Sequence, residues 1–131
     1  MRYGFITELV AVKLREAGSR GRAQWRLLTE LAYNSQLHGM IVVPAGFVTD
    51  FASVPRMPIV FLLAGDTAHA SAVVHDYLVR VQFPACKISW ARAADVFLEA
   101  MKHEKTPAWR RAIMHWAVAV ANPANTWETQ T

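Results

Sequence analysis

The sequence predicts an α+β domain, in which a small antiparallel N-terminal sheet is followed by three helices and the first two helices form an antiparallel pair. Apolar residues alternate with a period of two in the first half of the chain and recur at helical spacing in the second half. The chain has 131 residues, of which 53% are hydrophobic, so it can bury one core. We expect a single domain over residues 1–123 and a polar C-terminal tail over residues 124–131.

Three segments are predicted to be strands. Residues 5–14 alternate with period two. Residues 25–33 fit either a strand or a helix, and their aromatic and β-branched side chains at alternate positions favour a strand. Residues 40–50 form a strand that breaks at Pro44, which has no backbone donor and therefore marks an edge or an end.

The predicted helices cover residues 67–81, 90–103 and 106–121. Asp66 and Ser89 are suitable N-caps for the first two. The third begins with Thr-Pro and ends before Asn-Pro, both of which are typical helix boundaries. Only the short loop "QFPACKIS" joins the first two helices, so we expect them to be antiparallel.

Composition excludes several classes of protein. One cysteine, Cys86, cannot form an internal disulfide framework or a multi-cysteine metal site. The net charge of +4 comes from scattered basic residues, which argues against nucleic acid as a partner. We expect no transmembrane segment, because no apolar run approaches the ~18 to 20 residues that span a bilayer. The N-terminus has no signal-peptide pattern, so we expect none.

Two ionisable residues interrupt the first predicted helix. His75 and Asp76 lie off its broad apolar face, in a second stripe with small and apolar neighbours. Asp95 interrupts an apolar stripe of the second helix in the same way. Because the helices are expected to be antiparallel, we predict that His75 and Asp95 lie within reach of a hydrogen bond or of one bridging water.

This arrangement suits catalysis. An aspartate that faces a histidine fixes its tautomer and makes it a better base, so His75 and Asp95 are the candidate catalytic residues. Asp76 would point to the side and could bind a hard cation such as Ca²⁺. The alternative is structural: the His–Asp pair is a satisfied buried contact, and Asp76 pairs with Arg80 one turn later. The sequence leaves both interpretations open.

The loop at residues 43–56 is the second candidate element. It carries several polar residues among prolines and apolar side chains: Thr49, Asp50, Ser53 and Arg56. Asp50 and Ser53 can bond backbone groups and hold the loop rigid. We predict that residues 47–56 pack near the beginning of the His75 helix or beside Asp76, so that Asp50 could bind the same cation. The alternative is that its polar residues serve only as turn and cap residues.

The strings "GFVTDFASVPR", "HDYL" and "RAADVFLEAM" resemble a family of small proteins of tailed bacteriophages and prophages, a domain of unknown function. The resemblance runs from about Trp25 to Met101. It implies a phage origin and no settled activity. We expect a virion component, in the tail or at its tip, that reaches the virion after synthesis in the host cytoplasm. Its partners would be other virion proteins. Trp109 and Trp116 lie seven residues apart on the third helix and are candidate core or interface anchors.

The same residues show a remoter likeness to the helical core of secreted phospholipases A2. The likeness implies His75 as general base, Asp76 as calcium ligand and Asp95 as the carboxylate that orients the histidine. Val79 stands where a tyrosine is expected, and the glycine-rich calcium loop and the disulfides are absent. The alternative function is therefore a calcium-dependent hydrolase of the host envelope, acting on membrane lipid esters. Both functions are compatible in one tail protein.

Overall fold

The computed structural model describes residues 2–14, 24–49 and 69–120. All of the described strands precede the described helices, which confirms the α+β prediction. The strands are β1 (Gly4–Phe5), β2 (Ala11–Lys13), β3 (Trp25–Leu27), β4 (Leu31–Ser35), β5 (Gly39–Val43) and β6 (Val48–Thr49). The helices are α2 (His69–Tyr77), which continues into a π-helical segment (Leu78–Gln82), α3 (Trp90–His103) and α4 (Ala108–Val120).

The strands form two small antiparallel sheets. Their orders are β1-β4-β5 and β2-β3-β6. The segment predicted as one strand over residues 5–14 therefore splits between the two sheets. Thr7 lies at the break, where its hydroxyl donates to the carbonyl of Glu30 (3.1 Å) and accepts from the amide of Ala32 (2.9 Å). Residues 25–33, predicted as one strand, contain β3 and the first part of β4 with a bend at residues 28–29 between them, so they contribute to both sheets.

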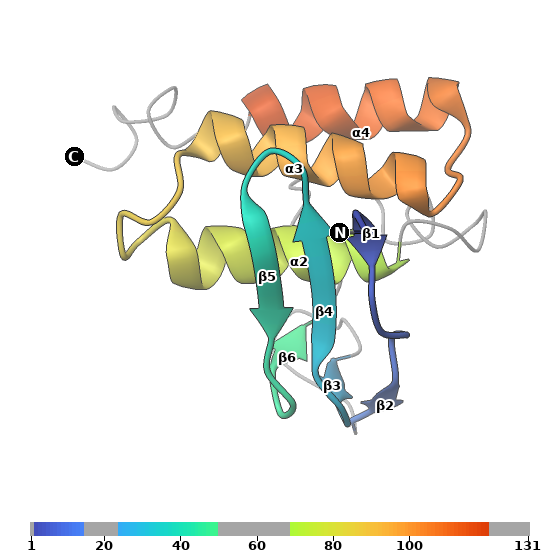
Figure 1. Cartoon of the computed structure of the whole chain (residues 1–131), viewed down its shortest axis with the longest axis vertical. Helices are drawn as coiled ribbons and strands as arrows, with labels where there is room; N and C mark the ends of the chain where they lie inside the picture. Colours follow the sequence, from blue (N-terminus) through green and yellow to red (C-terminus); the bar gives the residue numbers. More distant parts are fainter. Residues whose placement is uncertain (1, 15–23, 50–68, 121–131) are drawn as a thin grey trace.

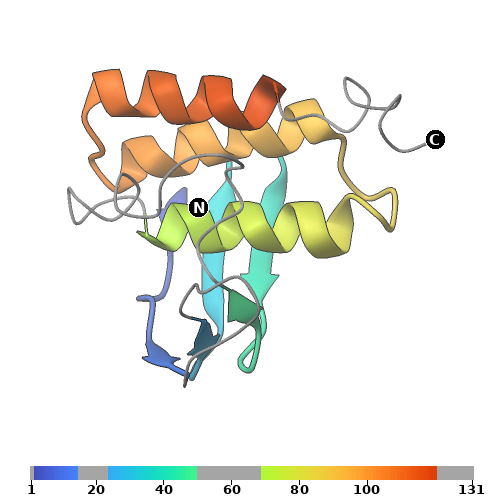
Figure 2. The ribbon, with the colours of Figure 1, turned by 180° about the vertical axis from the view of Figure 1, so that it is seen from behind.

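The three helices run alternately in opposite directions, and the β4–β5 hairpin crosses α2 and α3 (Figure 1). The antiparallel arrangement of α2 and α3 was predicted. Seen from behind, α2 covers the hairpin, and α4 lies beyond α3 at the edge of the molecule (Figure 2). None of the described helices combines the length and the hydrophobicity needed to cross a membrane.

The core lies between the β4–β5 hairpin and the inner faces of the helices. Its largest fully buried apolar side chains come from both layers: Tyr33, Phe97, Leu27, Leu31, Ile41, Leu78, Met101 and Met114. The carboxylate of Glu99 joins the helices to the β4–β5 hairpin near the hairpin turn. Glu99 of α3 accepts hydrogen bonds from the Tyr33 hydroxyl (2.7 Å), the Ser35 hydroxyl (2.7 Å) and the Gln36 amide (3.1 Å). Burial and this carboxylate raise the pKa of the Tyr33 phenol above its ordinary value of 10.

Helix capping at α3 follows the prediction, and at α2 it involves a carboxylate that was not predicted. Ser89 caps α3, as predicted, by accepting from the amide of Arg92 (3.0 Å). The first amides of α2 instead donate to Glu104, at the far end of α3: Ser71 at 2.8 Å and Ala70 at 3.2 Å. The Ser71 hydroxyl adds a bond of 2.6 Å to the same carboxylate. The predicted cap, Asp66, lies outside the described residues.

Candidate functional site

His75 lies in the core. Its ring stacks at a tilt on Phe97, with centroids 4.9 Å apart, and meets Trp90 edge-on at 6.4 Å. The side chain is fully buried, and neither ring nitrogen has a hydrogen-bond partner among the described residues. Burial lowers the pKa of His75 from 6.5 to about 3, because the charged imidazolium would lose its hydration. His75 is therefore neutral at physiological pH.

Asp95 bonds a different histidine. Its carboxylate Oδ1 lies 3.1 Å from Nε2 of His115 on α4, and its side chain is 56% exposed. The predicted hydrogen bond between His75 and Asp95 is not formed. The reason is helical geometry: Phe97 contacts His75, and a residue two positions earlier lies about 200° away around the helix. The face of α3 that contains Asp95 meets α4 and solvent.

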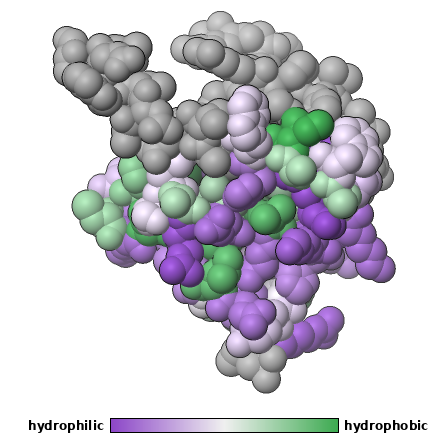
Figure 3. Space-filling view, turned by 90° about the horizontal axis from the view of Figure 1, so that it is seen from above, coloured by the Kyte–Doolittle hydropathy of each residue, from purple (hydrophilic) through white to green (hydrophobic). Residues whose placement is uncertain are grey.

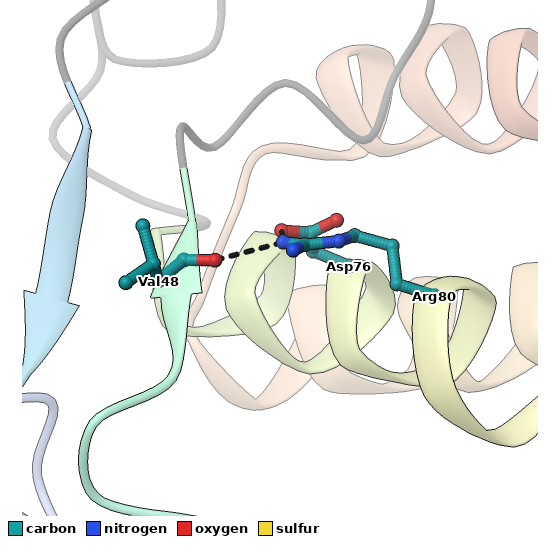
Figure 4. A network of polar contacts seen from close by, with 3 residues as sticks. All are labelled: Val48, Asp76 and Arg80. Carbon is teal, nitrogen blue, oxygen red and sulfur yellow. Dashed lines mark hydrogen bonds and ion pairs between the residues drawn. The ribbon is translucent and has the colours of Figure 1, made fainter. Parts of the chain in front are cut away.

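Asp76 is buried and neutralised by a neighbour. Its Oδ2 accepts from Nη1 of Arg80 at 3.0 Å, and the same nitrogen donates to the carbonyl of Val48 at 2.7 Å (Figure 4). The Asp76 side chain is 6% exposed and that of Arg80 is 53% exposed. The structural alternative for Asp76, a pair with Arg80 one turn later, is confirmed. The guanidinium also lies over the Phe47 ring, at 4.9 Å from its centroid.

The beginning of the polar loop is therefore joined to α2. Phe47 and Val48 meet Arg80, and the Phe47 ring also meets Tyr77 edge-on at 5.6 Å. This confirms the predicted contact for the described part of the loop. Thr49 is buried and pairs with Trp25 across the sheet. The other predicted loop residues lie outside the described part of the chain: Asp50, Ser53 and Arg56.

The described residues do not by themselves form a calcium site. Calcium is usually held by six to eight oxygen ligands, several of them carboxylates. Asp76 already contacts a guanidinium, and the ranges 2–14, 24–49 and 69–120 contain no group of three acidic, histidine or cysteine side chains placed to share an ion. Asp50, the other predicted ligand, lies outside the described residues.

A shallow groove runs along α3 beside the hairpin turn, with a volume of about 550 Å³. Its lining includes both apolar and ionisable side chains: Gln36, Leu37, Asp95, Leu98, Glu99, Lys102 and His103. Sequence reasoning missed the importance of Glu99 here. Its partners Tyr33 and Ser35 are 66 and 64 residues away, so no local motif could have indicated it.

An apolar stripe lies on the outer side of α4. Trp109 is 62% exposed, Ile113 43% and Trp116 65%, and Ala112 beside them is also exposed. We call these four residues the α4 stripe. The opposite side of the helix packs inward through Arg110 and Met114. Figure 3 looks onto this side of the molecule, where green and near-white side chains gather with purple hydrophilic ones around them.

The family model described as "Protein of unknown function (DUF1353)" matches residues 25–118. The chain belongs to the DUF1353 family. The DUF1353 match begins at β3 and ends within α4, so it includes the hairpin, the buried His75 and the whole α4 stripe. No curated protein and no solved structure matches the chain.

The DUF1353 family carries no assigned activity, so the geometry must indicate the function. His75 and Asp95 do not form the predicted pair: His75 is buried without a hydrogen bond, and Asp95 forms an exposed pair with His115. The α4 stripe is the feature that sequence analysis left undecided between core and interface, and its exposure excludes the core. It was undecided because α4 carries apolar residues on more than one face.

Proposed function

We propose that this protein is a structural component of a bacteriophage virion, in the tail or at its tip, and that it acts through protein contacts made by α4. The observation that carries the proposal is the α4 stripe. Two tryptophans more than 60% exposed on one helix face form the kind of anchor that dominates binding energy at protein interfaces. The sequence resemblance to phage proteins is the support for placing the protein in a virion.

The hydrolase alternative has less support from the geometry. A general base must reach the proton that it removes, either directly or through one water. The ring nitrogens of His75 are buried, the ring contacts Phe97 and Trp90, and Asp95 is bonded to His115. Calcium-dependent hydrolysis of a lipid ester by the wild type, lost in His75→Gln, would establish the hydrolase activity, and the particle experiment below would still decide the virion role.

The test is incorporation into particles. A phage or prophage that encodes the protein is deleted for it and complemented with wild type, Trp116→Glu or Met40→Glu. Met40 is 53% exposed on the sheet, far in sequence from α4, and serves as the matched control. We expect mass spectrometry of purified particles to find the wild type and the control in fixed copy number, with Trp116→Glu strongly depleted. Absence of the wild-type protein from purified particles refutes the proposal.

A further inference from the structure

We infer that the occupant of the α4 stripe is a second copy of this chain, packed antiparallel across a two-fold axis between Ala112 and Ile113. This inference deepens the proposed function, because it names the partner for the same surface. It rests on three properties of the described residues: the symmetry of the stripe, the charges around it and its area.

The two tryptophans lie at equal distances from the midpoint of the stripe. The stripe reads W-x-x-A-I-x-x-W from Trp109 to Trp116, with Ala112 and Ile113 in the middle. A two-fold axis at the centre places Trp109 of one copy against Trp116 of the other, and Ala112 against Ile113 in the same way. An isologous interface requires this self-complementarity, because each residue must accept its partner in both directions. The alanine lets the two backbones approach closely.

Charge favours the antiparallel arrangement over a parallel one. Two basic residues, Lys102 and Lys105, precede α4, and α4 contains no acidic residue. A parallel pair would bring the two copies of Lys105 together at the beginning of the helices. An antiparallel pair separates them by ~20 Å along the helix axes and aligns the helix dipoles favourably. No charged residue lies within the stripe itself.

The area indicates a weak dimer. With the exposures above, the two tryptophans and Ile113 offer ~400 Å² per copy, and flanking residues add to this. Stable interfaces bury ~800 Å² per partner, and smaller ones are transient. We therefore expect a dimer dissociation constant of ~10 to 100 µM. Such a weak contact suffices when many copies are held close together in one particle.

The first test is sedimentation of the full chain over ~1 to 300 µM, a range chosen to bracket that affinity. We expect a monomer–dimer equilibrium that Ile113→Glu weakens at least ~10-fold, because it removes apolar contact and brings two carboxylates together at the axis. Met40→Glu should leave the equilibrium unchanged. All three proteins should melt alike, since the substituted side chains are exposed.

The second test fixes the direction of pairing in a Cys86→Ser background, because Cys86 is exposed and would cross-link by itself. Ala112→Cys should form a disulfide dimer on mild oxidation. Ala108→Cys should not, since its two copies would lie ~14 Å apart along the antiparallel helices, beyond disulfide reach. Efficient cross-linking of both variants indicates a parallel pair and overturns the inference.

A monomer at the highest concentration, with no Ala112→Cys cross-link, also overturns the inference. Under that result, a loss of Trp116→Glu from particles means that another virion protein occupies the stripe, and the proposed function stands. If the wild type dimerises but is absent from particles, the proposed function fails and the self-association stands. The two experiments therefore distinguish the two failures.

Discussion

The buried imidazole of His75 should make the stability of this protein depend on pH. In the folded state burial lowers its pKa from 6.5 to about 3, whereas in the unfolded chain the ring titrates normally. Between these values the unfolded state binds a proton that the folded state does not. The free energy of unfolding therefore falls as pH falls through this window, and the contribution of His75 is fully present only above about pH 6.5.

The magnitude follows from the size of the shift. Each pH unit well inside the window is worth ~1.4 kcal/mol, so the loss should reach about 2 kcal/mol near pH 5. His75 is fully buried, so solvent screening does not reduce this figure substantially. His75→Leu replaces the ring by an apolar side chain of similar volume. It should remove this slope and change stability at neutral pH by less than ~1.5 kcal/mol, because no hydrogen bond is lost.

The assay is urea unfolding followed by circular dichroism, for wild type and His75→Leu at several pH values from about 8 to 4.5, across the window of linkage. All other ionisable groups are common to both proteins, so the difference between the two slopes isolates His75. Parallel slopes would refute the reasoning. A loss above ~3 kcal/mol at neutral pH in His75→Leu would show that the ring nitrogens make bonds that stabilise the fold.

Three further substitutions, two of them paired with a control variant, test the contacts that organise the fold. Asp76→Asn should lower the free energy of unfolding by ~1 to 2 kcal/mol, a figure already reduced because its partner Arg80 is half-exposed and screened by solvent. Asp95→Asn, which breaks an exposed pair, should lower it by less than ~0.5 kcal/mol in the same urea titration. Glu104→Ala should cost ~1 to 2 kcal/mol and speed hydrogen exchange in α2, and unchanged exchange would contradict its capping role. Gly4→Ala should destabilise more than Gly39→Ala. Both have positive φ (111° and 94°), but a Cβ at Gly4 would lie 3.0 Å from a histidine ring and one at Gly39 meets nothing within 4 Å, so equal melting points would contradict the contact.

Local signals in the sequence predicted the helices well. The bounds of α3 match the prediction, because Ser89 and the helical spacing that follows are both local. The split of residues 5–14 could not be predicted in this way. It depends on Thr7, whose partners Glu30 and Ala32 are 23 and 25 residues away, at the beginning of β4.

The prediction of the candidate site was wrong about which neighbouring helix Asp95 faces. Asp95 was recognised correctly as a polar interruption in an apolar helix. However, α3 lies between α2 and α4, so such a residue can face either one, and its periodicity alone does not say which. The partner of Asp95 proved to be His115, which appeared in the sequence as an isolated histidine. Asp76 was simpler, because Arg80 lies one turn away on the same helix.

The cap that Glu104 supplies to α2 has a consequence for how the chain folds. α2 has nine residues, too few to be stable alone in water, and its first turn contains no acidic residue. The carboxylate that satisfies its first amides comes from 33 residues later in the chain. The cap on α2 can therefore form only after the whole of α3 has been synthesised, so the beginning of the earlier helix is completed by the end of the later one.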